Sequence, residues 1–182
     1  MVLQFLNLFL VDLLLLAFPS IYFLFQKDKF VLKDFASFFG FRKPTFPEDL
    51  LVSLKVFFIM TFVSFVLSAL FYFLNLNDLE KVVNTIKTFS NQDLLILVYL
   101  LIVRVFVEEF FFRAFLTSKI GVLGSSFAFS LMHFGYGSIA EIIGSFFLGM
   151  ILGHYYSKLK NIFPIYLAHM FYNTFVLIIM FR

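Results

Sequence analysis

Apolar stretches of about 20 residues recur along this chain and restrict its fold more than any other feature. The first stretch, residues 2–25, is interrupted only by Gln4, Asn7, Asp12 and Pro19. A helix needs about 20 mainly apolar residues to cross a membrane. Irregular backbone cannot face lipid, because its polar groups would lose their hydrogen bonds. The sequence therefore predicts an all-α bundle of transmembrane helices.

Composition argues against a soluble domain. Of the 182 residues, 62% are hydrophobic and 14% are charged, against about 45–50% and about 25% in soluble domains. A soluble fold of this size could not bury so much apolar surface. The net charge of +3 is explained by Lys and Arg in short loops, so no nucleic-acid partner is expected. The absence of cysteine excludes disulfides, thiolate catalysis and Cys-ligated metals.

Six membrane spans are expected along the chain. They lie at residues 2–25, 50–76, 93–116, 121–134, 139–156 and 162–181. An amphipathic segment near 27–40 is expected in the membrane interface, and 77–91 is expected to be a polar loop. Gly149 and Gly153 have the spacing that permits close helix packing. No repeat divides the chain, so residues 1–182 are expected to form a single membrane domain.

Basic residues gather in alternate loops. The loop at 26–49 carries five Lys or Arg, and the turns after the third and fifth predicted spans carry two each. The loop at 77–91 carries two and the turn at 135–138 carries none. Cytoplasmic loops are enriched in Lys and Arg. We therefore expect a multi-pass cell-membrane protein with both termini outside.

Polar side chains within the last four predicted spans are the candidates for a functional site. Each charge at membrane depth costs at least about 2.5–3.5 kcal/mol, so it needs a partner or a purpose. We expect Arg104 to be a packing or cavity-lining charge, Glu141 to be solvated and His154 to have no functional role. The full set is Arg104, Glu108, Glu109, Arg113, His133, Glu141, His154, His169 and Asn173.

Four of these side chains reach similar depth when counted from the expected cytoplasmic ends. At about 1.5 Å of rise per residue, Glu108 lies about 12 Å in and His133 about 18 Å. His169 lies about 10 Å in and Asn173 about 16 Å, and the four-residue spacing of this pair places both on one helix face. Glu108, His133, His169 and Asn173 are therefore expected to face one another across the bundle.

The two adjacent glutamates are expected to play different roles. Glu109 and Arg113 are four residues apart and can form an intrahelical ion pair. Glu108 points about 100° away from Glu109 on the same helix, which frees it to face the bundle interior. One acid is thus expected to be neutralised by arginine and the other to face a polar cavity.

Three motifs follow one another on hydrophobic segments. They read Glu108-Glu109-x-x-x-Arg113, then Phe129-x-x-x-His133, then His169-x-x-x-Asn173. In this order they resemble the CAAX-protease and bacteriocin-processing family, also called CPBP or Abi, which includes the CAAX prenyl endopeptidase. The resemblance covers residues 92–182, which are expected to be the catalytic core.

The resemblance implies an intramembrane endopeptidase that cleaves a membrane-associated peptide or protein, with prenylated CAAX proteins as one substrate class. It implies that Glu108 and His133 activate a water molecule, as a buried carboxylate and an imidazole can. It also implies that His169 and Asn173 hold the developing oxyanion, a task that suits fixed neutral donors. The site is expected to open toward the cytoplasm.

The resemblance also implies two supporting residues, and the polar side chains of the site could bind a metal. By the same resemblance, Glu109 and Arg113 support the site without reacting. Glu108, His133 and His169 also form one carboxylate and two imidazoles, a set that can bind catalytic zinc. We favour a mechanism that needs no cofactor, and a zinc-dependent version of the same peptidase is its alternative.

Two further functions compete with peptidase activity. A non-enzymatic immunity or scaffold protein could use the same fold, although all four candidate residues are present. Intramembrane Glu and His also build proton relays. Six short spans without a repeat argue against a typical secondary transporter.

Overall fold

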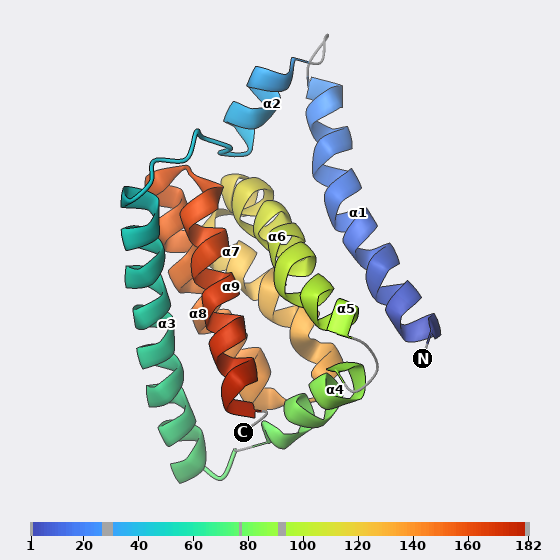
Figure 1. Ribbon diagram of the computed structural model, residues 1–182, viewed down its shortest axis with the longest axis vertical. Helices are drawn as coiled ribbons and strands as arrows, with labels where there is room; N and C mark the ends of the chain where they lie inside the picture. Colours follow the sequence, from blue (N-terminus) through green and yellow to red (C-terminus); the bar gives the residue numbers. More distant parts are fainter. Residues whose placement is uncertain (1, 27–30, 77, 91–93, 181–182) are drawn as a thin grey trace.

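The computed structural model describes residues 2–26, 31–76, 78–90 and 94–180, and these residues contain helices and no strand. Two long helices, α1 (Val2–Gln26) and α3 (Glu48–Phe73), flank a central group formed by the helices between Leu94 and Met180 (Figure 1). The short helix α2 (Leu32–Phe38) lies at one end of the molecule, and α4 (Glu80–Ser90) lies at the other (Figure 1). The all-α prediction is confirmed.

Four helices in the described residues are long and apolar enough to cross a membrane, where six were expected. They are residues 6–26 of α1, all of α3, α8 (Ile139–Leu159) and α9 (Ile162–Met180). Of the six expected spans, those at 93–116 and 121–134 are therefore not among these four. The protein is a multi-pass membrane protein on the evidence of the four helices.

The expected span at 93–116 is helical from Leu94 but changes its winding along its length. It consists of α5 (Leu94–Val98), the π-helical segment η1 (Tyr99–Arg104), α6 (Val105–Glu108) and the π-helical segment η2 (Glu109–Leu116). Four charged residues and an alternation of α- and π-helical turns distinguish this segment from the four long apolar helices. π-Helical turns are rare and often occur at functional sites.

The expected span at 121–134 corresponds to α7 (Thr117–Met132), followed by the 3₁₀ turn η3 (His133–Tyr136). Gly121 lies four residues into α7 and has φ of 73°, a conformation outside the helical region. Glycine adopts positive φ without a steric penalty from a Cβ atom. α7 has 16 residues in all, and the kink at Gly121 makes its regular part shorter still than the about 20 residues that a spanning helix needs.

Helices α7 and α8 pack closely at the two glycines predicted from the sequence. A Cβ atom on Gly149 would lie 3.2 Å from Cβ of Ser126, and one on Gly153 would lie 3.0 Å from Cγ1 of Val122. Both neighbours belong to α7. Small residues allow helix backbones to approach in membranes, so α8 can lie against α7, and the predicted close packing is confirmed.

Phenylalanine side chains join α2 to the bundle. The described part of the expected amphipathic segment forms α2, and residues 27–30 of the prediction lie outside the described residues. Its position in the membrane interface stays a prediction. The ring of Phe39 lies 4.5 Å from that of Phe110 and 6.1 Å from that of Phe23, between centroids. Buried aromatic pairs of this kind add about 0.5–1.5 kcal/mol each beyond their buried area, so α2 is anchored to α1 and η2.

The expected polar loop at 77–91 is wrong for residues 80–90, which form α4. The segment is polar overall, but Val82 and Ile86 are four residues apart and share one face. Val82 is buried, and both residues line the central cavity. Tertiary contacts to this apolar face stabilise a helix that composition alone does not predict.

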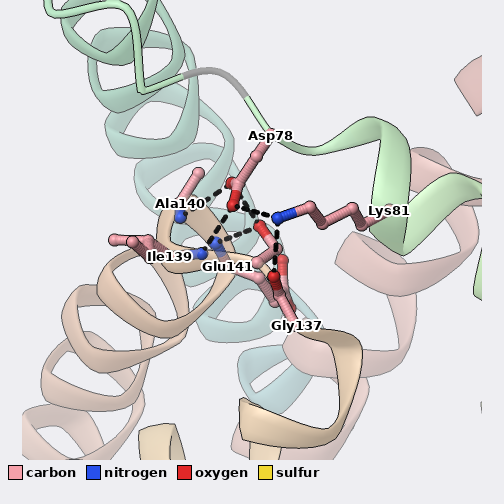
Figure 2. A network of polar contacts seen from close by, with 7 residues as sticks. Asp78, Lys81, Gly137, Ile139, Ala140 and Glu141 are labelled. Atoms are coloured by element: carbon pink, nitrogen blue, oxygen red, sulfur yellow. Dashed lines mark hydrogen bonds and ion pairs between the residues drawn. The ribbon is translucent and has the colours of Figure 1, made fainter.

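Asp78 joins the start of α4 to the start of α8 (Figure 2). Its carboxylate accepts hydrogen bonds from Oγ of Ser138 at 2.7 Å, from N of Ile139 at 2.9 Å and from N of Ala140 at 3.1 Å. Nearby, Nζ of Lys81 donates to the carbonyl of Gly137 at 3.0 Å (Figure 2). The amides of Ile139 and Ala140 lie at the start of α8, where backbone N–H groups have no intrahelical acceptor. Asp78 therefore caps α8 from a distant part of the sequence.

We expect Asp78→Ala to lower the free energy of unfolding by about 1 kcal/mol, as is typical for the loss of a helix cap. Hydrogen bonds, above all from the Ser138 hydroxyl, hold the pKa of Asp78 at about 2, below its usual 3.8. The stabilisation is thus complete above pH 3.8 and is lost as the pH falls toward about 2. Chemical unfolding in detergent at several pH values measures it. The exposed neighbour Glu80 gives the control Glu80→Ala, and equal stability of the two variants at pH 7 would contradict the expectation.

Candidate active site

A cavity of about 160 Å³ lies in the centre of the bundle, and all four predicted catalytic residues line it. Glu108 comes from the end of α6, His133 from the start of η3, and His169 and Asn173 from α9. The four-residue spacing of His169 and Asn173 directs both side chains into this cavity, as predicted. The folded chain thus brings together residues that are separated by up to 65 positions in the sequence.

Glu108 lies at the junction of α6 and η2 and is buried. Its Oε1 forms an ion pair with Nε of Arg104, at 3.1 Å. Arg104 also lines the cavity, so the expectation of a cavity-lining charge is confirmed. In the described part of the chain, Glu108 makes no hydrogen bond to another side chain beyond this pair, and its second oxygen remains available to a bound molecule.

His133 is held by the backbone of its own helix. Its Nδ1 lies 2.9 Å from the carbonyl oxygen of Phe129. A carbonyl oxygen only accepts hydrogen bonds, so Nδ1 carries the proton. In the neutral ring, Nε2 then has a free lone pair, and His133 can accept a proton there.

His169 is held by a carboxylate instead. Its Nδ1 lies 2.7 Å from Oε1 of Glu109, and Oε2 of Glu109 forms an ion pair with Nε of Arg113 at 3.3 Å. The predicted ion pair between Glu109 and Arg113 is confirmed. Both members are almost fully buried, with exposed side-chain fractions of 0% and 1%. Glu109 and Arg113 therefore form a layer behind His169, away from the cavity.

Phe129 is the packing centre of the site. Its ring lies 4.6 Å from the ring of His133 and 6.0 Å from that of His169, between centroids. The guanidinium carbon of Arg113 lies 4.1 Å from the centre of the same ring. Cation–π contact of this type is worth about 2 kcal/mol when desolvated. Phe129 is thus a core aromatic, as expected, and it fixes the spacing of the two imidazoles.

The π-helical winding of η2 is supported by hydroxyl groups. Oγ1 of Thr117 donates to the carbonyl of Phe112 at 2.9 Å, and Oγ of Ser125 donates to the same carbonyl at 2.5 Å. Wider winding disturbs the regular backbone hydrogen bonds, and such carbonyls need other donors when buried. Two hydroxyls from α7 supply them, which stabilises the segment that carries Glu109 and Arg113.

Two acidic residues have roles that their sequence positions do not reveal. Glu141 was expected to be solvated, but it lines the same cavity as Glu108 and His133, so that expectation is wrong. Asp12 is only 2% exposed and bonds to Arg104. The α8 histidine, His154, is exposed and does not line the cavity. Asp12, Glu141 and His154 all lie within apolar stretches, so only the tertiary structure shows which of them are near the cavity.

The candidate zinc ligands Glu108, His133 and His169 come from three helical segments. Among the described residues, no three or more His, Asp or Glu side chains are placed so that they could hold a metal ion. Arg104 pairs with one oxygen of Glu108, and Glu109 occupies Nδ1 of His169. The other oxygen of Glu108 and Nε2 of His169 remain open, but the alternative set of Glu108, His133 and His169 is not gathered into a metal site among the described residues in this arrangement.

The cavity extends from the polar residues toward α4. Apolar side chains form this part of its wall: Val82, Ile86, Leu97, Leu100, Leu101, Val176, Leu177 and Met180. The loops used to assign the cytoplasmic face include the one that holds α2, and α2 lies at the end of the molecule opposite α4 (Figure 1). The expected opening toward the cytoplasm stays a prediction, and the lining residues lead toward the other face.

Residues 90–175 match the family model described as Rce1-like, type II CAAX prenyl endopeptidase. The chain carries an Rce1-like domain. The resemblance seen in the three motifs is thereby confirmed. No curated protein and no solved structure matches the chain significantly. The match of residues 90–175 to this family model implies peptidase activity.

The Rce1-like domain contains all six predicted site residues. The cavity nevertheless includes residues that precede the domain, namely Met60 of α3 and Val82 and Ile86 of α4. The helices that precede the domain therefore complete the wall around its polar residues.

Proposed function

We propose that this protein is an intramembrane endopeptidase that hydrolyses a peptide bond with water activated by Glu108 and His133. One observation carries the proposal: a carboxylate, two imidazoles and an amide from three helical segments line one cavity inside a membrane domain. Charged and polar groups are expensive at this depth and usually mark function. The match to an Rce1-like family model supports the same reaction class.

The proposed reaction begins with a water molecule between Glu108 and His133. The free oxygen of Glu108 and Nε2 of His133 are both proton acceptors, since Arg104 and the Phe129 carbonyl occupy their other atoms. One of them takes a proton as the water oxygen attacks the carbonyl carbon of the substrate. The protonated group then returns that proton to the leaving amine. General acid–base catalysis of this kind contributes about 10²- to 10⁴-fold.

His169 and Asn173 are proposed to stabilise the oxyanion of the tetrahedral intermediate. Asn173 donates through its side-chain amide. Nδ1 of His169 faces Glu109, so donation from Nε2 requires an imidazolium. The carboxylate of Glu109 would accept the hydrogen bond from Nδ1 of that imidazolium, which replaces the neutral imidazole expected from the sequence. Preorganised donors of this type are worth about 10²- to 10³-fold in kcat.

The proposed substrate is a membrane-associated peptide or protein with an apolar attachment, and a prenylated CAAX-type C-terminus is one such group. The apolar wall that leads from the polar residues toward α4 supports this class. We also propose that the segments at 94–116 and 117–136 lie within the membrane beside the four long helices, giving six segments in total. A non-enzymatic immunity or scaffold protein remains the alternative function.

A cleavage assay with histidine variants tests the proposal. Purified wild type in detergent is expected to cleave members of a fluorogenic peptide panel that includes prenylated CAAX peptides. The double variant His133→Ala, His169→Ala is expected to lose this activity, and His154→Ala, at the exposed third histidine, is expected to keep it. Absence of cleavage by wild type, together with full complementation of the host by the double variant, would favour the scaffold function.

Chelation tests the proposed independence from metal. We expect dialysis against a strong chelator to leave the rate of cleavage unchanged, because Glu108, His133 and His169 do not form a group that could hold a metal ion among the described residues. The measurement is the initial rate before and after dialysis, with a known zinc peptidase treated in parallel as the control. Loss of activity that zinc restores would contradict the metal-free mechanism.

A further inference from the structure

A buried carboxylate on α1 lies behind the cavity and has no part in the mechanism so far. Asp12 is only 2% exposed. Its Oδ2 accepts a hydrogen bond from Oη of Tyr99 at 2.7 Å, and its Oδ1 accepts one from Nη1 of Arg104 at 2.9 Å. A charge within an apolar membrane helix is costly and is seldom present without a purpose. Asp12 also lies outside the Rce1-like domain at 90–175.

Arg104 connects Asp12 to the proposed general base. Nη1 of Arg104 bonds Asp12, while Nε of the same guanidinium pairs with Oε1 of Glu108 at 3.1 Å. The guanidinium is planar and rigid, so fixing one of its nitrogens fixes the direction of the others. The position of Asp12 therefore determines where Arg104 meets Glu108.

Without the hydrogen bond to Asp12, the side chain of Arg104 could adopt a second position. A second cavity of about 520 Å³ lies next to the first, and Arg104 and Tyr136 line both. Polar side chains that could accept hydrogen bonds from a guanidinium also line it: Asn7, Thr85 and Thr88. The side chain of Arg104 could turn into this space and leave Glu108 unpaired. The bond to Asp12 opposes this movement.

We propose that Asp12 is a positioning residue for the reaction, which acts through Arg104 to hold the carboxylate of Glu108 in its reactive orientation. The proposal rests on the function proposed for Glu108. Misplacement of a reacting group by about 1 Å can cost about 100-fold in rate. Helix α1 thereby contributes to catalysis, although it lies outside the matched domain and does not line the first cavity with any described residue.

Two substitutions test the chain of contacts without leaving an unpaired buried cation. In Asp12→Asn, Arg104 retains Glu108 as its counter-ion, so the variant is expected to fold. We expect kcat to fall about 10- to 100-fold while KM and the melting temperature change little. Tyr99→Phe removes one hydrogen bond to Asp12 and is expected to lower kcat about 2- to 10-fold. Because both act through one carboxylate, the double variant is expected to be no slower than Asp12→Asn.

Conservative and remote variants separate positioning from folding. Asp12→Glu keeps the charge and is expected to recover part of the lost kcat. Ser20→Ala removes another polar group of α1, whose hydroxyl bonds the carbonyl of Leu16, and is expected to keep wild-type kcat. Wild-type kcat in Asp12→Asn, or additive effects with Tyr99→Phe, would overturn the positioning role while cleavage itself still supports the proposed function. Absence of cleavage by wild type would overturn the proposed function, and the positioning role with it.

Discussion

Glu108→Gln lowers kcat for peptide cleavage by about 10²- to 10⁴-fold, which is the usual contribution of a general base. Glutamine has nearly the same shape as glutamate but accepts protons very poorly. The amide oxygen can still face Nε of Arg104, so the cavity keeps its form. Asp12 still balances the charge of Arg104 through its bond to Nη1. The loss of activity is therefore chemical and not a consequence of unfolding.

The measurement is kcat and KM for a cleaved peptide, with the melting temperature in detergent determined alongside. Glu48→Gln is the matched control, because Glu48 is an exposed glutamate in the first turn of α3. It should keep wild-type kcat. A Glu108→Gln protein that cleaves at more than about a tenth of the wild-type rate would remove Glu108 from the mechanism, since general base catalysis contributes at least about 10²-fold.

Glu109→Gln lowers the free energy of unfolding by about 3–5 kcal/mol, the usual cost of removing one partner from a buried ion pair. Arg113 is 1% exposed, and Glu109 is the carboxylate with which it forms an ion pair among the described residues. None of the three guanidinium nitrogens has a hydrogen-bond partner in the described part of the chain. The contact with the ring of Phe129 at 4.1 Å offsets only part of an uncompensated charge.

Reversible unfolding in mixed detergent measures this effect. The double variant Glu109→Gln, Arg113→Met is the informative comparison, because removing both charges of a buried pair is often nearly neutral. It is expected to recover most of the lost stability but not the activity, since His169 no longer faces a carboxylate. If the single and double variants unfolded at the same denaturant concentration, the ion pair would not be what stabilises this layer.

Local rules predicted a large part of the candidate site. The spacing of Glu109 and Arg113 predicted their ion pair, and the spacing of His169 and Asn173 predicted their shared face. Both predictions depend only on helix geometry, which holds within a few residues of the chain. The separation of Glu108 from Glu109 follows from the same geometry, and the structure places one in the cavity and the other behind it.

Local sequence patterns could not predict the contacts between distant segments. Glu141 and His154 lie in the same apolar stretch, yet only Glu141 lines the cavity. Residues 80–90 are polar in composition, yet they form α4 because Val82 and Ile86 find an apolar surface. The bond between Asp12 and Arg104 joins residues 92 positions apart. No periodicity within either segment encodes such a pair.

The sequence by itself determined that this is an all-helical membrane protein, because long apolar stretches with few charges are stable in lipid only as helices or closed barrels. It also determined which residues can do chemistry, because ionisable groups are rare in such stretches. Tertiary structure alone decided how the helix at 94–116 is wound, that Glu141 lines the cavity and which helix supports Arg104. Those outcomes depend on packing between segments, where each side chain responds to neighbours that the linear order does not specify.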